Sequence, residues 1–299
     1  MNAKLVGVDI GGTRIKVAAF TLDGIEIGHW FRDSEDHPAK GLPQFAETVR
    51  QILCEIASDD ALVGISSPGL VAKDNRSIAY QPSKLQGLEG LDWTNLLQRH
   101  RVVPVLNDAH AALLGEVWAG AAAGLQDVIL LTLGTGVGGA IMCDGKLLRG
   151  HLGRAGHLGH LSLAPKGEKS IFGIPGALEC AIGNYNVKTR TGGRFNSTRE
   201  LVEAHLLGDQ AATKIWVESV QNLAQAITSF ISVLDPEAVI VGGGIAQAGP
   251  ALFEPLARFL DDMEWRPAGN RVRVIPAALG EWAGAYGAAW NALKSFQAN

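Results

Sequence analysis

The sequence has few cysteines, no long hydrophobic run and no excess of positive charge. Its three cysteines, Cys54, Cys143 and Cys180, show no paired spacing, which argues against a disulfide framework. No stretch approaches the roughly 20 consecutive apolar residues of a membrane-spanning helix. Residues 1–4 lead directly into a strand-like run, without the apolar core of a signal peptide. We therefore expect a cytoplasmic protein.

The charge balance excludes further classes of protein. The formal net charge is −4 and only 19% of the residues are charged, so an extended basic surface for nucleic acid or an anionic membrane is not expected. Hydrophobic residues make up 47% of the 299 positions, enough to build one large domain or two of moderate size. The composition is ordinary for a soluble enzyme.

Two glycine-rich turns are the main positive feature of the sequence. Residues 9–13, Asp-Ile-Gly-Gly-Thr, follow one apolar run, and residues 133–139, Leu-Gly-Thr-Gly-Val-Gly-Gly, follow another. Glycine turns let backbone N–H groups approach phosphate oxygens closely. Asn107 and Asp108 end a third apolar run between them. Two such turns with a carboxylate between them predict a polyphosphate held from two sides beside a general base, as in a kinase.

Strand and helix patterns alternate along the chain. A strand, a glycine turn and a returning strand occur near residue 9 and again near residue 134, which indicates two similar lobes by topology alone. We predict an α/β fold with a cleft between the lobes, where ligands bind at the carboxyl ends of strands. The expected strands are 4–10, 15–20, 25–31, 61–66, 128–133, 137–143 and 238–241, and the expected helices are 42–58, 109–119, 198–208, 210–233 and 279–293.

The order of the motifs resembles that of the ROK family, which groups sugar kinases and sugar-responsive repressors within the actin-like ATPase (hexokinase) superfamily. The motifs are residues 9–13, Asn107-Asp108, residues 133–139, Gly156 with Gly159 and His160, Leu178-Glu179, and residues 241–244. The resemblance covers residues 4–290. It implies two actin-like, ribonuclease H-like lobes: residues 1–106 completed by a helix at 282–299, and residues 107–281.

The resemblance implies a role for each residue on the phosphate side. Asp108 matches the catalytic aspartate that accepts the proton of the sugar hydroxyl; the alternative is a helix cap. Asp9 matches the residue that orients Mg²⁺ or its waters. Lys16 either reaches phosphate or is a solvated strand lysine. The phosphates would be held by Gly11, Gly12, Thr13, Gly134, Thr135 and Gly136, and the adenosine side by Gly243 and Gly244.

The sugar side departs from the family pattern. Ser67, Gly69, Asn107, His160 and Glu179 match family positions that contact the sugar. Position 157, however, carries histidine where relatives usually have glutamate. A neutral imidazole offers one acceptor, whereas a carboxylate accepts several hydrogen bonds. His157 therefore predicts an altered sugar specificity; the alternative is a loop histidine without a ligand. Near residue 83 a family amide is missing, and Ser83 or Lys84 would replace it.

The zinc motif of the family is also absent. Its three thiolate positions are occupied by Ser170, Phe172 and Ala177, and Cys180 is out of register. Structural zinc requires four nitrogen or sulfur ligands. We therefore predict no structural zinc, with the loop held instead by apolar packing of Phe172, Ile174 and Pro175.

The resemblance implies an ATP- and Mg²⁺-dependent, glucokinase-like sugar kinase that phosphorylates the terminal hydroxyl of a hexose or amino-hexose, as a homodimer. One alternative keeps the fold but changes the acceptor to an unusual sugar, polyol or cyclitol. Another is a non-catalytic sugar-sensing regulator, although regulators of this family carry a helix-turn-helix segment before the first strand, which this sequence does not show. A third alternative replaces ATP with polyphosphate as the donor.

Overall fold

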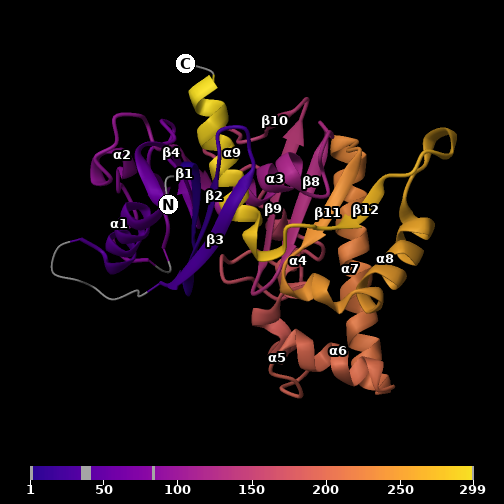
Figure 1. Cartoon of the computed structure of the whole chain (residues 1–299). Coiled ribbons are helices and arrows are strands. Elements are labelled where there is room, and N and C mark those ends of the chain that lie inside the picture. Colours follow the sequence, from indigo (N-terminus) through magenta and orange to yellow (C-terminus); the bar gives the residue numbers. More distant parts are fainter. Residues whose placement is uncertain (1–2, 35–41, 83–84, 298–299) are drawn as a thin grey trace. The chain divides into compact units, whose positions relative to one another are not determined.

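The structure is a computed structural model that describes residues 3–34, 42–82 and 85–297. The chain forms two compact units. Unit 1 comprises Met1–Gly124, Arg149–Ala155 and Ala278–Asn299, and unit 2 comprises Leu125–Leu148 and Gly156–Ala277. Each unit is built around its own five-stranded sheet (Figure 1). The predicted α/β class is confirmed.

The sheet of unit 1 has the order β3-β2-β1-β4-β7. Its strands are β1 (Ala3–Ile10), β2 (Arg14–Phe20), β3 (Glu26–Asp33), β4 (Ala57–Ser67) and β7 (Val105–Asn107). The first three strands pair antiparallel, and β1, β4 and β7 pair parallel. A small hairpin of β5 (Leu70–Val71) and β6 (Ile78–Tyr80) follows β4. The parallel strands bring three chain segments to one edge of the sheet, where their carboxyl ends carry the polar residues of the site.

Two helices cover opposite faces of this sheet. Side chains alternate along β1, so Val6 faces the core that contains α1 (Gln44–Ile56), whereas Leu5 faces the core that contains α9 (Ala283–Gln297). Helix α9 lies directly on the strands (Figure 1). A Cβ atom at Gly7 would lie 1.8 Å from a carbonyl oxygen of α9, and one at Gly64 would lie 2.0 Å from another. These positions therefore require glycine.

Helix α3 (Asp108–Ala119) packs equally closely against α9 in unit 1. A Cβ atom at Gly287 would lie 1.7 Å from the carbonyl oxygen of Ala111. The buried carboxylate of Glu116 accepts hydrogen bonds from the backbone N–H groups of Ala278 and Leu279, where the chain returns to unit 1, and from Ala121, where it leaves α3. The remaining helices of unit 1 are the short α2 (Trp93–Leu96) and η5 (Gly280–Trp282).

The sheet of unit 2 repeats the topology of unit 1. Its order is β10-β9-β8-β11-β12. The strands are β8 (Val128–Leu133), β9 (Val137–Cys143), β10 (Lys146–Leu147), β11 (Ala238–Gly242) and β12 (Arg273–Pro276). Again three strands pair antiparallel, and β8, β11 and β12 pair parallel. The predicted repeat of topology is confirmed, and β8 and β9 have the predicted bounds.

The long helix α7 (Gln210–Leu234) supplies most of the apolar cover of this second sheet. Its buried Trp216, Leu223 and Ile227 belong to one core with the strand residues Leu131 and Val241. The other helical segments of unit 2 are η1 (Leu158–His160), α4 (Leu178–Ile182), η2 (Asn184–Asn186), α5 (Val187–Arg190), α6 (Thr198–Leu206), η3 (Gly244–Ala248), α8 (Pro250–Met263) and η4 (Pro267–Gly269).

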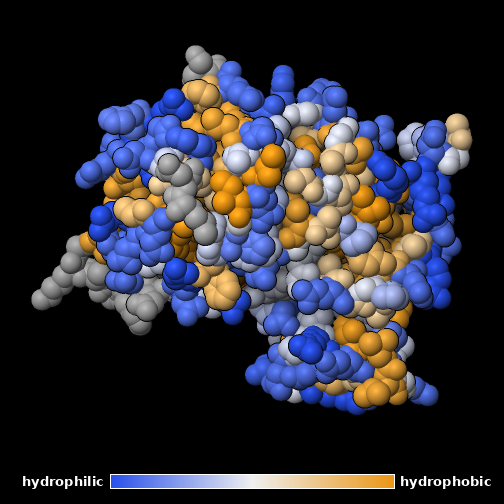
Figure 2. All heavy atoms as spheres, in the orientation of Figure 1, coloured by the Kyte–Doolittle hydropathy of each residue, from blue (hydrophilic) through white to orange (hydrophobic). Residues whose placement is uncertain are grey.

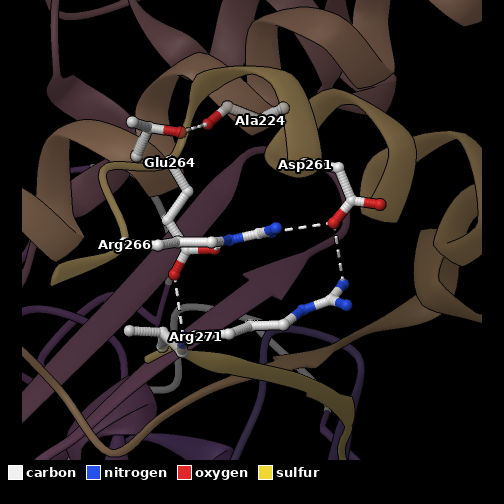
Figure 3. A network of polar contacts seen from close by, with 7 residues as sticks. Ala224, Asp261, Glu264, Arg266 and Arg271 are labelled. Atoms are coloured by element: carbon white, nitrogen blue, oxygen red, sulfur yellow. Dashed lines mark hydrogen bonds and ion pairs between the residues drawn. The ribbon is translucent and has the colours of Figure 1, made fainter. Parts of the chain in front are cut away.

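A polar network fastens the end of α8 to the start of β12 (Figure 3). The Glu264 carboxylate is buried and accepts hydrogen bonds from Arg266 Nε at 2.7 Å and from the Val272 N–H group at 2.8 Å. Asp261 binds Arg266 at 2.8 Å and Arg271 at 3.4 Å. Paired in this way, the buried carboxylate avoids the cost of an isolated charge, and the α8–β12 connection is fixed.

The structure differs from several predicted boundaries. The sequence-based division placed α3 and residues 278–281 in the second lobe, whereas they group with unit 1 because α3 packs on α9 and Glu116 binds residues 278–279. The helix expected at 279–293 begins at Ala283, after the 3₁₀ turn η5. Helix α8 was not predicted; it contains Pro255, a residue that normally interrupts helices.

On the face shown in Figure 2, hydrophilic residues are interspersed with apolar patches. One patch covers the end of α6, where Leu206 is 66% and Leu207 is 88% exposed. No helix in the described ranges has both the length and the apolar character that a membrane crossing requires.

Candidate functional site

Asp9 is the penultimate residue of β1, at the carboxyl edge of the unit 1 sheet. The strand register places it opposite Lys16 on β2 and Ser66 on β4. Ser66 Oγ donates a hydrogen bond to Asp9 Oδ1 at 2.6 Å. Burial, with a smaller contribution from the Asp108 carboxylate, raises the pKa of Asp9 to about 6 against the opposite effects of Ser66 and Lys16. Such a carboxyl group gives up its proton readily when a cation binds.

The neighbouring glycine turn is closed by backbone hydrogen bonds. Gly11 N–H donates to the Arg14 carbonyl at 2.9 Å, and the Thr13 carbonyl accepts from Ser34 N–H at 2.8 Å. Gly12 lies between them in the same turn. Lys16 lies 3.7 Å from the Glu281 carboxylate, so phosphate would compete with this ion pair for the lysine.

Asn107 and Asp108 lie at the start of α3. Asn107 is the N-cap: its Oδ1 accepts from the N–H groups of Ala109 at 3.0 Å and His110 at 3.4 Å. Asp108 is the first helical residue, and its side chain is exposed, with Oδ1 accepting from Ala109 N–H at 2.8 Å. The capping role considered for Asp108 thus belongs mainly to Asn107. The helix N-terminus favours a carboxylate at this position.

The turn after β4 lies beside Asn107. Ser67 pairs with Asn107 in the β4–β7 register, and Asn107 Nδ2 donates to the Gly69 carbonyl at 3.1 Å. Gly69 has φ +110°, and a Cβ atom there would lie 2.7 Å from the Tyr80 carbonyl oxygen. The structure therefore brings together the predicted residues Ser67, Gly69 and Asn107, next to Asp108.

Unit 2 holds the second glycine turn, Gly134 to Gly136, between β8 and β9. Gly134 N–H donates to the Gly136 carbonyl at 3.0 Å, and the Thr135 carbonyl accepts from Tyr185 N–H at 2.9 Å. Gly243 follows β11 with φ +88°, and a Cβ atom there would lie 2.4 Å from the Leu133 carbonyl oxygen. The two glycine turns of unit 2 are thus neighbours, as the parallel β8–β11 pairing requires.

These turns form one end of a cavity of about 580 Å³. It is lined by Gly134, Thr135, Asn184, Thr198, Arg199, Val202, Glu203, Leu206, Gly244, Ile245, Gln247 and Ala248. Val202, Leu206 and Ile245 form an apolar wall, and the polar side chains of the lining are Thr135, Asn184, Thr198, Arg199, Glu203 and Gln247. A cavity of this size and lining suits a nucleoside.

Thr198 is the most informative residue of this cavity. Its side chain is buried, and within the described part of the chain Oγ1 has no hydrogen-bond partner. An unpaired buried hydroxyl costs about 1–3 kcal/mol, which a ligand in the cavity would recover. The sequence predicted helix α6 but not its role; the signal is the capping arrangement Ser197–Glu200, which places Thr198 in the first turn.

His157 precedes the 3₁₀ turn η1 and His160 is its last residue, with their ring centroids 5.8 Å apart. Burial lowers the pKa of His160, and the charge of His157 lowers it further, so His160 is neutral near pH 7 and both donates and accepts. Gly159 lies against β9: a Cβ atom there would be 2.0 Å from the Val137 carbonyl oxygen. Packing against β9 therefore requires glycine at position 159, and the next residue, His160, supplies a polar side chain.

Glu179 lies in the first turn of α4 and is buried. Burial raises its pKa, while hydrogen bonds from the Ser170 hydroxyl and the Val137 N–H group lower it. Among the described residues, Oε1 has no hydrogen-bond partner. Gly136 leaves room for the other oxygen: a Cβ atom there would lie 2.9 Å from Oε2. Glu179 is thus a buried acceptor adjoining the glycine turn.

The loop before α4 is held differently from the prediction. Phe172 contacts the His160 ring at 4.9 Å but is 55% exposed, and Ile171 is 73% exposed. Backbone bonds close the loop instead, from Ser170 N–H to Ile174 and from Gly173 N–H to Ser170. Apolar packing is therefore not its main support, because its tip points into solvent. Ser83 and Lys84, the proposed replacements for the missing amide, lie outside the described residues.

Metal-ligating side chains are sparse around these residues. Within the ranges that the structure describes, no group of three or more His, Cys, Asp or Glu side chains is arranged to hold a metal ion. Asp9 and Asp108 form a pair of carboxylates, which suits an ion that takes its remaining ligands from substrate phosphates and water.

Comparisons with known proteins place these features in context. The model of the ROK family matches residues 5–295. The sequence is 32% identical over 307 residues to a glucokinase of Thermotoga maritima, covering 96% of each chain. It is 29% identical to an N-acetylmannosamine kinase of Escherichia fergusonii, over 95% of this chain and 96% of the relative. A ROK family glucokinase from Streptomyces griseus, solved in complex with glucose and AMPPNP, matches with a TM-score of 0.75 and 28% identity, over 97% of this chain and 99% of that one.

Proposed function

Because this chain belongs to the ROK family, as its ordered motifs predicted, we propose that it is an ATP-dependent sugar kinase. It would transfer the γ-phosphoryl group to the terminal hydroxyl of a hexose or amino-hexose. The observation that carries the proposal is the exposed Asp108 carboxylate beside Asn107 and the Ser67–Gly69 turn. The actin-like fold of the family is shared with the Streptomyces griseus glucokinase, which binds glucose and an ATP analogue.

Asp108 is the general base of the proposed mechanism. Its carboxylate accepts the proton of the sugar hydroxyl as that oxygen attacks the γ-phosphorus atom. Asn107 caps the helix and binds the Gly69 carbonyl, so both neighbours of the base are fixed. In phosphoryl transfer such positioning, together with electrostatic stabilisation, supplies most of the rate enhancement.

Asp9 and the glycine turns serve the phosphates. Mg²⁺ prefers oxygen ligands and keeps several waters, so it would be held by Asp9, water and the phosphates of ATP, where it neutralises charge on the transferred group. The N–H groups of Gly11 and Gly134 close their own turns, so the direct contacts to phosphate oxygens would come from the N–H groups of Gly12, Thr13, Thr135 and Gly136. Magnesium dependence stays a prediction of the family resemblance.

The cavity of unit 2 favours ATP over polyphosphate as the donor. Its apolar wall and the unpaired Thr198 hydroxyl suit a nucleobase and ribose, and a polyphosphate chain has neither. The acidic Glu203, which pairs with Arg199 at 2.9 Å, also opposes a second run of negative charge. Gly244 lines the same cavity, in agreement with the adenosine-side role expected for Gly243 and Gly244.

The sugar contacts we propose in unit 2 are His157, His160 and Glu179. Both named relatives above act on hexoses or amino-hexoses, and His157 departs from the family pattern, so an unusual sugar, polyol or cyclitol is the second candidate acceptor. A non-catalytic sensor does not require a general base, so the exposed carboxylate of Asp108 favours a kinase. Cytoplasmic location, where ATP is available, and a homodimer remain part of the proposal.

The proposal is tested by ATP consumption with hexoses, N-acetylated hexosamines and cyclitols, followed by identification of the phosphorylated product. Asp108→Asn keeps the size and the cap geometry but removes the base. We expect kcat to fall by about 100- to 10,000-fold with the Kd for ATP within about twofold. A variant that kept more than a few per cent of kcat would exclude Asp108 as the base.

A further inference from the structure

Arg190 is the last residue of α5, and its guanidinium group reaches back to the end of α4. Its Nη1 atom donates to the Gly183 carbonyl at 2.7 Å and to the Cys180 carbonyl at 3.2 Å, and Nη2 donates to the Ile182 carbonyl at 3.5 Å. Burial lowers the pKa of Arg190 to about 10, so the group is charged near pH 7. One cation therefore binds three carbonyl groups that the end of a short helix leaves without helical partners.

The chain that follows α4 runs beside the glycine turn of residues 134–136. Asn184 N–H donates to the Gly134 carbonyl and Tyr185 N–H donates to the Thr135 carbonyl, both at 2.9 Å. Two adjacent N–H groups thus hold two adjacent carbonyl groups of the turn for which a phosphate-binding role is proposed. A displacement of residues 184–185 would therefore displace the turn as well.

The same segment forms part of the cavity of unit 2. Asn184 Oδ1 accepts a hydrogen bond from Thr198 N–H at 2.7 Å, and both residues line the cavity. Gly134 and Thr135 line it as well. The segment that supports the glycine turn therefore also fixes Thr198, the residue whose buried hydroxyl has no partner among the described residues.

Arg190 stabilises the point at which the chain leaves the helix. If α4 continued, the N–H group of Asn184 would bond to the Cys180 carbonyl four residues earlier. In the structure this N–H group turns to Gly134, and the Cys180 carbonyl accepts from Arg190 and from Asn186 Nδ2 at 2.9 Å instead. A hydrogen bond from a charged donor is stronger than one between neutral groups, so Arg190 is the main replacement for the helical partner.

We propose that Arg190 is a positioning residue for the nucleotide: it fixes the end of α4 so that residues 184–185 hold the glycine turn and the cavity wall in the geometry that binds ATP. This rests on the proposed function, in which the turn receives phosphate and the cavity receives the nucleoside. The action is indirect, through the main chain, and it comes from a helix to which the sequence motifs assigned no role.

The proposed sugar contact of α4 is held by other means. Glu179 lies near the start of the helix, where Leu178 N–H donates to the Leu161 carbonyl at 2.8 Å. Leu178 and Ile182 also belong to the apolar core of unit 2. Loss of Arg190 should therefore displace the segment after α4 more than Glu179, and nucleotide binding should suffer more than sugar binding.

The test compares Arg190→Met with Arg194→Met. Methionine keeps a long unbranched side chain but donates no hydrogen bond. For Arg190→Met we expect the Kd for ADP, measured by calorimetry, to rise about tenfold, with the Kd for the sugar that the wild-type chain binds most tightly within about twofold. Arg194 binds the carboxylate of Asp209 at the start of α7, so Arg194→Met should change neither Kd.

Hydrogen exchange separates positioning from general stabilisation. In the free protein, the amides of Asn184 and Tyr185 should exchange at least about tenfold faster in Arg190→Met than in wild type, because local opening of this segment becomes easier. The amide of Leu223, in the buried middle of α7, should exchange as it does in wild type. A residue that only stabilised the unit as a whole would accelerate all three amides alike.

Arg190→Lys is the second variant, because it keeps the charge but lacks the planar group that reaches several carbonyl oxygens at once. It should raise the Kd for ADP by a smaller factor than Arg190→Met, and it carries the test if thermal unfolding shows that Arg190→Met does not fold. A Kd for ADP equal to that of wild type in the folded variants, or equal acceleration of exchange at all three amides, overturns the inference alone. A wild-type chain that binds ADP but phosphorylates no sugar overturns the proposed function alone. A chain that does not bind ADP overturns both.

Discussion

Ser66 donates a 2.6 Å hydrogen bond to Asp9 across the parallel strands β1 and β4. The bond stabilises the ionised form of a carboxyl group whose pKa is nevertheless raised to about 6, first by burial and also by Asp108. Ionising the Asp9 carboxyl group therefore costs free energy as long as no ligand is bound. A cation at this position would remove that cost, which links the fold of unit 1 to ligand binding.

Asp9→Asn should abolish activity and yet stabilise the protein at high pH. Because the folded pKa, about 6, lies above the ordinary value of 3.8, the contribution of Asp9 to stability is fully present below about pH 4 and is lost as the pH rises through about 6. Relative to wild type, the variant should gain on the order of 3 kcal/mol at pH 8 and nothing at pH 4. Unfolding is measured at both pH values without Mg²⁺. Asp33→Asn, at an exposed strand end, is the control, and a gain that did not depend on pH would contradict the account.

Thr198→Val should weaken ATP binding without affecting the sugar. The substitution keeps the side-chain shape but removes the unpaired buried hydroxyl of Thr198, a residue that lines the cavity of unit 2. We expect the KM for ATP to rise about five- to tenfold, the equivalent of one lost hydrogen bond, and the free protein to be at least as stable as wild type.

The matched control is Thr228→Val on α7, where the hydroxyl donates to the Ala224 carbonyl within the helix. It should leave both KM values unchanged. If Thr198→Val bound ATP as tightly as wild type, the hydroxyl would not face the nucleotide.

His157→Glu should change the order in which acceptors are used. A carboxylate accepts several hydrogen bonds and donates none, whereas neutral imidazole accepts one. We expect the ratio of kcat/KM between two sugars to change at least about tenfold, measured over the panel of hexoses, hexosamines and cyclitols. His151→Glu, an exposed position on the 149–155 segment, adds the same charge and serves as the control. An unchanged ranking would make His157 a loop residue without a sugar contact.

Glu116→Gln should destabilise unit 1. The buried carboxylate accepts from three backbone N–H groups, of Ala121, Ala278 and Leu279, and an amide would turn donor atoms toward donors. We expect a loss of roughly 3 kcal/mol, measured as a lower denaturation midpoint by tryptophan fluorescence. Glu281→Gln, whose side chain is 58% exposed, should cost less than about 0.5 kcal/mol. Similar losses for the two variants would contradict the role assigned to Glu116.

The sequence predicted the parts of the fold that local patterns determine. The strands β8 and β9, the hairpins at the glycine turns and a cap near the start of α3 follow from apolar runs broken by glycine and from the residues that cap helices. The repeated strand order also followed from the repeated turn. The order of the motifs, which can be seen in a single sequence, predicted the family.

What the sequence did not predict depends on contacts between distant segments. Thr198 and Ser170 look like ordinary polar loop and helix residues until burial and partners are known. Helix α8 was missed because Pro255 obscures its pattern, and α3 was placed in the wrong unit because its packing partner α9 lies far along the chain. Tertiary packing decides each of these cases.

The position of α9 also sets an order for folding during synthesis. Gly7 and Gly64 lie against a helix that follows all of unit 2 in the sequence. On the ribosome, the residues of unit 2 emerge while one face of the unit 1 sheet is still uncovered. The unit made first is thus completed last, and its nascent apolar face is a natural target for chaperones.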